Sequence, residues 1–312
     1  MVVVFMRIGV SLTAIRGENN VEDAITAARE AADAGLGDVW FGQRFDTDAI
    51  GLAGIVGHEI PGLRVGVAAV PIFARHPILV SSQAQTSQAA TGGRFRLGLA
   101  LGAPALVEST FGVPYQRPVA RLREFLTALD PLLRTGTVDF HGELITATTP
   151  MSAAVAGAMP PVPVLVAAMG PQALRVTGEL ATGVLPRLAG PGVLARRIVP
   201  TVTAAAERVG RPAPAIVAIV PVAVSSDLDH ARRAARERLA FYETIPSYRR
   251  VLDEEGVERA GDLAVIGDED TVGASLRRYL DAGATEIIAT ETDLGGPAGR
   301  LRTWQALGQL MS

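Results

Sequence analysis

Residues 64–102 decide the fold class and read RVGVAAVPIFARHPILVSSQAQTSQAATGGRFRLGLALG. An apolar run rich in β-branched residues opens this stretch, and a second apolar run covers 95–101. Between them, Pro77 suits a first helical position and the glycine pair at 92–93 suits a helix end, which predicts a helix from Pro77 to about residue 90. Both flanking strands are apolar enough to be buried on two faces, so the stretch indicates a parallel βαβ unit.

The rest of the chain repeats this alternation of strand and helix. Apolar runs separated by helical patterns predict eight strands, at 6–12, 38–41, 64–70, 95–101, 162–167, 183–185, 215–224 and 286–290. Eight alternating strands favour one (β/α)8 TIM barrel domain, residues 1–312, over a doubly wound sheet. Three segments fall outside the alternation and are expected as insertions, at about 103–117, 135–160 and 243–262. The first has no clear period and is expected to be irregular, and the second opens with a small hairpin around His141-Gly142. Asn20 is expected to cap the first helix, and Asp46 or Thr47 the second.

The composition excludes several functional classes. All 29 basic residues are arginine, so Schiff-base lysines and P-loop lysines are excluded. The absence of cysteine excludes disulfides and thiolate metal sites, and no other metal-ligand spacing is visible, so no metal site is expected. A net charge of −3 gives no field that would favour nucleic acid. No apolar run reaches the roughly 18 residues of a membrane span, and the first ten residues lack the features of a signal peptide, which predicts a cytoplasmic protein.

The active site of a parallel barrel lies at the carboxyl ends of its strands. Most residues predicted at these ends are small or apolar, which suits a flat, largely apolar ligand with a few polar anchors. The motif Met169-Gly170-Pro171-Gln172 is a candidate phosphate site, because Gly170 leaves the backbone open and the N–H groups of the first helical turn point at an anion. A Gly-Pro helix start without a ligand explains the same residues equally well.

His76 is the rim residue that could act as an acid or a base, since it follows the third predicted strand and histidine titrates near neutral pH. A capping or structural histidine beside Pro77 is at least as well supported by the sequence.

Almost the whole chain resembles the bacterial luciferase-like monooxygenase superfamily, in the branch that uses the deazaflavin coenzyme F-420. The matching stretches lie at 7–11, 38–41, 64–70, 75–77, 92–99, 111–114, 267–272 and 281–283. The run Gly-Gly-Arg-Phe-Arg-Leu-Gly-Leu at 92–99, after the Arg-His-Pro helix start, is the most specific of them.

The resemblance implies a barrel with the flavin-like ring at the carboxyl ends of the strands. It implies a non-proline cis peptide bond behind the ring, which would join Val67 and Ala68. It also implies ring contacts at Val70, Leu101 and Gly102, and phosphate contacts at Met169, Gly170, Pro171 and Gln172.

Two positions depart from the family's pattern. Family dehydrogenases place an Asp-His pair after the second strand, where this chain has Gln43 and Arg44, and some carry a glutamate at the position of Ala103. Gln43 is then expected to hydrogen-bond the ring and Arg44 to hold an anionic group, which makes them catalytic candidates beside His76. Arg187 joins the cofactor-binding candidates, because Arg44, Arg75 and Arg187 fall near the predicted rim and arginine pairs carboxylates such as those of the coenzyme's glutamyl tail.

These residues predict a cytoplasmic oxidoreductase that exchanges a hydride between reduced coenzyme F-420 and a small organic substrate, as a homodimer with neither a nucleic-acid nor a membrane partner. The first alternative is an FMN-dependent luciferase-like monooxygenase. The second alternative is a catalytically silent flavin-binding protein, which the missing Asp-His pair keeps open.

Overall fold

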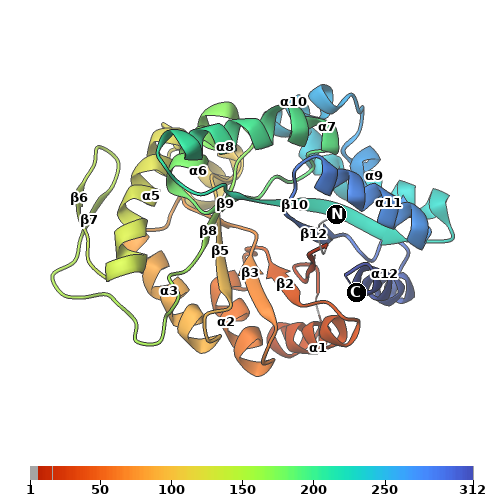
Figure 1. Cartoon of the computed structure of the whole chain (residues 1–312), viewed down its shortest axis with the longest axis horizontal. Coiled ribbons are helices and arrows are strands. Elements are labelled where there is room, and N and C mark those ends of the chain that lie inside the picture. Colours follow the sequence, from red (N-terminus) through yellow and green to blue (C-terminus); the bar gives the residue numbers. More distant parts are fainter. Residues whose placement is uncertain (1–5, 16, 312) are drawn as a thin grey trace. The chain divides into compact units, whose positions relative to one another are not determined.

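The structure is a computed structural model that describes residues 6–15 and 17–311. The chain forms two compact units (Figure 1). Unit 1 comprises Met1–Trp40, Leu185–Pro200 and Ala215–Ser312, and unit 2 comprises Phe41–Val184 and Thr201–Pro214. That residues 1–312 act as one domain stays a prediction. Residues 1–5, on which the argument against a signal peptide partly rests, lie outside the described residues.

The sheet of unit 1 is parallel throughout. Its strands follow the order β11-β10-β12-β1-β2, with the bounds β1 (Ile8–Ser11), β2 (Asp38–Phe41), β10 (Ala215–Val224), β11 (Val265–Gly267) and β12 (Glu286–Thr290). The helices are α1 (Asn20–Asp33), α7 (Pro191–Val193), the π turn η1 (Leu194–Ile198), α9 (Leu228–Glu243), α10 (Pro246–Glu255), η2 (Ala260–Leu263), α11 (Glu269–Asp281) and α12 (Pro297–Gln309). Helix α8 (Val199–Arg208) begins in unit 1 and continues in unit 2.

Unit 2 holds the other parallel strands. They are β3 (Arg64–Val67), β4 (Val70–Pro71), β5 (Phe95–Ala100), β8 (Val164–Ala167) and β9 (Gly183–Val184), and β5 pairs with β3, β4 and β8. The helices are α2 (Ala49–Glu59), α3 (Pro77–Ala90), α4 (Pro104–Phe111), α5 (Pro118–Thr135) and α6 (Pro171–Leu180). The predicted small hairpin is present as β6 (Asp139–His141) and β7 (Thr146–Thr148).

All eight predicted strands are present, and helices alternate with them as in a (β/α)8 barrel, so the predicted fold class is confirmed. The third predicted strand is interrupted, because β3 ends at Val67 and β4 begins at Val70. A further parallel strand, β11, was not predicted from the sequence, because its three residues are too few to show a hydrophobic period.

Two helix caps differ from the sequence-based expectation by one or two residues. Asn19 rather than Asn20 caps α1, with its side chain accepting from Val21 N–H at 3.1 Å. Asp48 caps α2, where Asp46 or Thr47 was expected. A cap is fixed by which side-chain oxygen reaches the free N–H groups, and several polar neighbours compete for that place.

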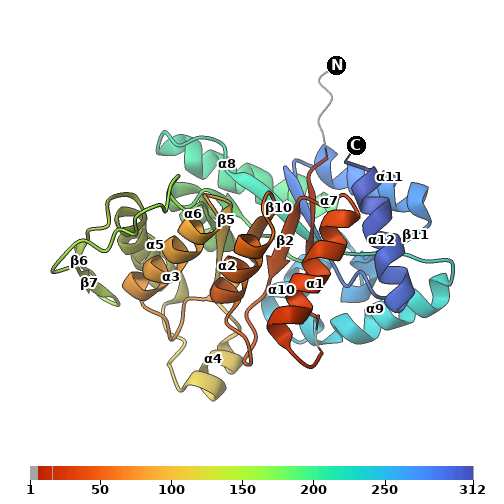
Figure 2. The same cartoon turned by 90° about the horizontal axis from the view of Figure 1, so that it is seen from below.

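The segment 103–117 was expected to be irregular but contains α4. Only Val107 of this helix is buried, so the segment shows no apolar period that would predict a helix. Figure 2 shows α4 lying apart from α2, α3 and α5.

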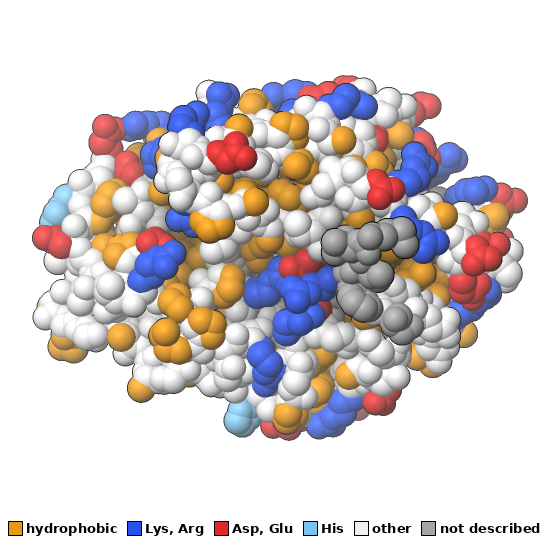
Figure 3. Space-filling view, viewed as in Figure 1, with side chains coloured by type: hydrophobic (Ala, Val, Ile, Leu, Met, Phe, Trp, Pro, Cys, Tyr) orange, Lys and Arg blue, Asp and Glu red, His pale blue; other side chains and the backbone are white. Residues whose placement is uncertain are grey.

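Within residues 6–15 and 17–311, no helix is long and apolar enough to cross a membrane. The same residues contain no group of three or more His, Asp or Glu side chains that could hold a metal ion. On the face drawn in Figure 3, basic and acidic side chains are interspersed.

Candidate cofactor site

The carboxyl end of β3 carries the backbone irregularity that the family resemblance implies. The cis peptide bond joins Ala68 and Ala69, so the prediction of Val67-Ala68 is wrong by one residue. The physical reason lies in the pairing: Val67 is still in the strand, and Ala68 N–H still donates to Phe41 O at 2.8 Å. The backbone therefore leaves the regular ladder only after Ala68.

Strands β4 and β5 bring the predicted ring contacts to one edge of unit 2. Val70 pairs with Leu99 and is fully buried, whereas Leu101 is half-buried just beyond β5. Gly102 has a φ of 78°, and a Cβ there would lie 3.0 Å from Val107 Cγ2. Glycine therefore suits this position both in conformation and in space.

The predicted phosphate motif lies at the neighbouring strand end. Ala167, the last residue of β8, pairs with Ala100 of β5, and Gly170 is the N-cap of α6. No side chain caps this helix, Gly170 is exposed, and a Cβ on it would meet nothing within 4 Å. The first intrahelical bond runs from Leu174 N–H to Gly170 O at 2.9 Å, so the N–H groups of residues 172 and 173 precede the helical ladder. Free N–H groups at an uncapped helix start can bind an anion, and the phosphate contact at this motif stays a prediction.

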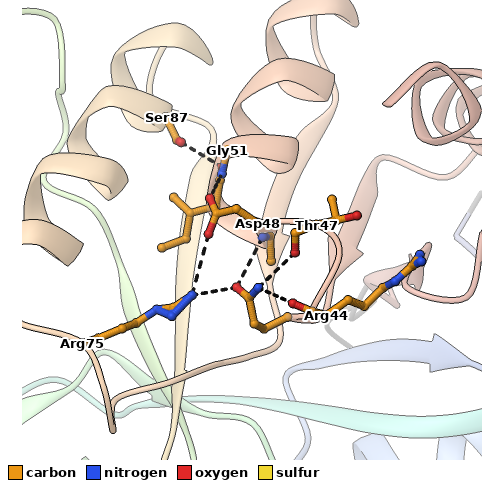
Figure 4. Close-up of polar contacts among 9 residues, drawn as sticks. Arg44, Thr47, Asp48, Gly51, Arg75 and Ser87 are labelled. Carbon is orange, nitrogen blue, oxygen red and sulfur yellow. Dashed lines mark hydrogen bonds and ion pairs between the residues drawn. The ribbon is translucent and has the colours of Figure 1, made fainter. Parts of the chain in front are cut away.

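Gln43, expected to face the ring, is instead the centre of a loop network. Figure 4 draws the polar contacts of this loop, with the partners Arg44, Thr47 and Arg75 labelled. Its Nε2 donates to Arg44 O at 2.6 Å and to Thr47 O at 3.0 Å. Its Oε1 accepts from Arg75 Nη2 at 2.8 Å and from Ala49 N–H at 3.4 Å. Because the amide has two donor hydrogens and two acceptor lone pairs, these four contacts use its full capacity. Gln43 therefore supports the loop after β2 and has no hydrogen-bonding capacity left for a ring.

The arginines expected as rim cations in unit 2 are paired with carboxylates of the same loop. Arg44 forms an ion pair with Asp46, and Arg75 Nη2 lies 3.7 Å from Asp48 Oδ1. Burial lowers the pKa of Arg75, while Asp48 acts in the opposite direction. The loop therefore carries a balanced charge rather than two uncompensated cations.

His76 is the N-cap of α3, and both of its ring nitrogens have partners. Ile78 N–H can only donate, so Nδ1 accepts from it at 3.3 Å. Thr146 O can only accept, so Nε2 donates to it at 2.9 Å. These contacts engage both ring nitrogens and match the capping role that the sequence left open. The acid role of His76 stays a prediction.

Tyr115 is a site residue that the sequence analysis missed. Its ring stacks on Phe73 with centroids 4.5 Å apart, and its hydroxyl donates to Gly102 O at 3.3 Å. Its backbone N–H donates to Glu108 Oε1 at 3.0 Å. Burial raises the pKa of Tyr115. Tyr115 thus fastens α4 to the end of β5, and the Phe-Gly-Val-Pro-Tyr sequence at 111–115 was the available signal.

Arg187 belongs to unit 1, and it too is paired. Its Nη2 donates to Glu291 Oε1 at 2.8 Å, and its guanidinium lies 4.8 Å from the centroid of the Tyr242 ring. Burial acts to lower the pKa of Arg187, but Glu291 and the neighbouring tyrosines outweigh it and raise the pKa. Glu291, at a φ of 50°, follows the last predicted strand, but its pairing with Arg187 was not foreseen from the sequence. Arg187 therefore forms part of an ion pair inside unit 1, and its cofactor contact stays a prediction.

Comparison with known sequences identifies the family. The model of the family described as luciferase-like monooxygenase matches residues 1–290. An uncharacterized protein of Mycobacterium tuberculosis is 29% identical over 266 residues, which cover 72% of this chain and 77% of that protein. The 5,10-methylenetetrahydromethanopterin reductase of Methanolobus tindarius is 23% identical over 301 residues, which cover 87% and 89%.

Solved structures show the same fold. The coenzyme F-420-dependent tetrahydromethanopterin reductase of Methanopyrus kandleri aligns with a TM-score of 0.81 at 20% identity, over 97% of each chain. The oxygenating constituent of 3,6-diketocamphane monooxygenase of Pseudomonas putida, in complex with FMN, aligns with a TM-score of 0.76 at 15% identity, over 98% of this chain and 97% of that one. With the match to the family model over residues 1–290, these findings establish that the chain is an oxidoreductase of the luciferase-like monooxygenase family.

Proposed function

We propose that this oxidoreductase uses the deazaflavin coenzyme F-420 and exchanges a hydride with a small organic substrate. The observation that carries the proposal is the open N-terminus of α6, one strand away from the end of β5. The choice of coenzyme is supported by a relative named 5,10-methylenetetrahydromethanopterin reductase and by a solved structure of the same fold described as a coenzyme F-420-dependent tetrahydromethanopterin reductase.

In this proposal each part of unit 2 has a defined task. The exposed start of α6 at Gly170 would bind a phosphate of the coenzyme through backbone N–H groups, with Met169, Pro171 and Gln172 as the neighbouring residues in the sequence. The backbone at Ala68, Ala69 and Gly102 would hold the ring, and the bound coenzyme would supply the hydride chemistry. No described side chain is assigned as the proton donor, because Gln43 has no free hydrogen-bonding group and His76 is engaged as a cap. The proton then comes from water or from the substrate.

The test is a side-by-side titration of the protein with coenzyme F-420 and with FMN, followed by fluorescence. We expect binding of the deazaflavin to be at least about tenfold tighter, or about 1.4 kcal/mol. Equal or tighter binding of FMN would overturn the proposal.

An FMN-dependent monooxygenase is the second candidate, because the structure of a monooxygenase with bound FMN shares the fold. Oxygen consumption by the protein when it is supplied with reduced FMN would favour this candidate. A flavin-binding protein without activity is the third candidate, and oxidation of the reduced deazaflavin by any organic acceptor would exclude it.

We further propose that the chain acts as a homodimer on a small-molecule substrate. Sedimentation at several protein concentrations measures its oligomeric state, and a mass of one chain throughout would contradict the dimer.

A further inference from the structure

The rings of two exposed phenylalanines lie close together in unit 2, in segments that follow the carboxyl ends of their strands. Phe45 is 76% exposed and Phe111 is 43% exposed, yet their ring centroids lie 6.5 Å apart with an interplanar angle of 50°. Phe45 lies in the segment after β2, and Phe111 ends the helix that follows β5. Because β3 lies between β2 and β5 in the strand order, the pair bridges the segments that flank the end of β3.

The segments that carry the two rings are held in place by hydrogen bonds and packing. The segment of Phe45 is fixed by the Gln43 network, which joins it to Arg75 at 2.8 Å. The helix of Phe111 is attached to Gly102 through Tyr115, and its single buried residue, Val107, packs beside the same glycine. These contacts hold the two segments in place, while the rings that they carry remain exposed.

A ligand that covers this exposed aromatic pair removes apolar surface from water, which favours binding. A phenylalanine side chain offers on the order of 150–250 Å² of surface, and each buried Å² contributes about 25 cal/mol. Exposed apolar surface at the rim of a site commonly marks a ligand contact.

The charges around the pair indicate which ligand it suits. Arg44 is paired with Asp46 and Arg75 lies against Asp48, while Glu108 accepts a backbone N–H from Tyr115. An anionic substrate would have to break the two arginine contacts to gain a partner of opposite charge from Arg44 or Arg75. A neutral substrate has no such cost.

We infer that Phe45 and Phe111 form the substrate-binding wall of this site and that the substrate is an uncharged, planar, largely apolar molecule. This inference rests on the proposed function, since it places the substrate beside the ring of a bound coenzyme. It names Phe45 and Phe111 as the residues that determine specificity.

The test uses two probes of similar shape, neutral 2-naphthol and anionic 2-naphthalenesulfonate, and protein already loaded with coenzyme F-420. Loading is measured first and separately by fluorescence titration. Probe binding is then measured by equilibrium dialysis. We expect the neutral probe to bind at least about tenfold tighter than the anion, and Phe45→Ala and Phe111→Ala each to weaken its binding by about fivefold or more.

Met159→Ala is the matched control. Met159 is 66% exposed, so the change removes a comparable apolar side chain, but it precedes β8 and therefore lies at the amino end of the strands. Its probe binding should equal that of the unmodified protein. Circular dichroism of all three variants checks that they are folded, which is expected because the rings are exposed.

The outcomes separate the two proposals. If the coenzyme loads but the anion binds as tightly as 2-naphthol, or neither phenylalanine variant weakens 2-naphthol binding, this inference is overturned and the proposed function stands. If the coenzyme does not load, the proposed function is overturned, and the inference falls with it.

Discussion

A change of Gly170 to aspartate tests the anion site at α6. Gly170 has φ −76° and ψ 146°, a conformation open to any L-residue, and a Cβ there would meet no atom within 4 Å. The new side chain therefore fits without displacing a neighbour. Aspartate is also a preferred N-cap, so its carboxylate is expected to accept from the free N–H groups that precede Leu174.

The same carboxylate excludes a phosphate. It occupies the N–H donors and places a negative charge near the anion, and two unit charges about 4 Å apart repel by about 1 kcal/mol in water and about 4 kcal/mol near a protein surface. We expect Gly170→Asp to weaken coenzyme binding by well over tenfold, that is by more than about 1.4 kcal/mol. We expect stability, by contrast, to rise by about 0.3–1 kcal/mol, because both the cap and the helix dipole favour a carboxylate at this end.

Two assays and two controls complete the experiment. Fluorescence titration gives the dissociation constant, and urea unfolding gives the free energy of unfolding. Gly170→Asn supplies a cap without a charge and should retain more binding than Gly170→Asp. Gly170→Ala supplies neither and should bind nearly as well as the unmodified protein. Repulsion by an exposed charge weakens with salt, so the defect of Gly170→Asp should shrink as ionic strength rises. Wild-type affinity of Gly170→Asp at low salt would refute the assignment of a phosphate to α6.

Three further predictions concern the supporting residues. Gln43→Ala removes the amide that binds two carbonyl oxygens of the loop after β2 and the Arg75 guanidinium, and should lower the free energy of unfolding in urea by about 2 kcal/mol; unchanged stability would contradict the loop-supporting role. His76→Ala should cost about 1 kcal/mol of stability with kcat within about twofold, and His76→Asn should restore the cap, whereas a fall in kcat of about 10²-fold in both variants would identify His76 as the acid. Burial raises the pKa of Tyr248 to about 12, so the unfolded chain loses this proton at a lower pH than the folded chain. The contribution of Tyr248 to the free energy of unfolding is therefore complete below about pH 10 and falls by about 2 kcal/mol as the pH rises to 12. Tyr248→Phe should flatten that slope in a pH series of unfolding curves, and an unaltered slope would show that other groups cause it.

The strands were largely predictable because their apolar runs are sharply bounded. Three of the eight, at 38–41, 215–224 and 286–290, match the structure residue for residue. Helix α4 was not predictable, since a helix with one buried residue has no apolar stripe to detect. The broken third strand was equally hidden, because an apolar run reads the same whether the ladder is continuous or interrupted.

The parts of the candidate site that depend on local backbone structure could be predicted from the sequence. The parts that depend on contacts between side chains far apart in the sequence could not. The Gly-Pro start of α6 could be placed because glycine and proline act locally. The role of Gln43 could not, since its partner Arg75 lies 32 residues further along the chain. The pairing of Arg187 with Glu291 spans 104 residues and was hidden for the same reason.

Gln43 and Arg44 stand where the family resemblance implies an Asp-His pair, and this difference bears on the role of the loop after β2. A glutamine does not transfer protons at neutral pH, and here its amide binds two backbone carbonyls and the Arg75 guanidinium. Arg44 in turn forms an ion pair with Asp46, so both positions have structural contacts in this loop. The loop then holds Phe45 against Phe111, and we expect this pair to form an uncharged surface beside the proposed coenzyme site. We therefore expect the chemistry of this member to be set by hydride transfer and apolar contact, with the proton supplied from outside the loop.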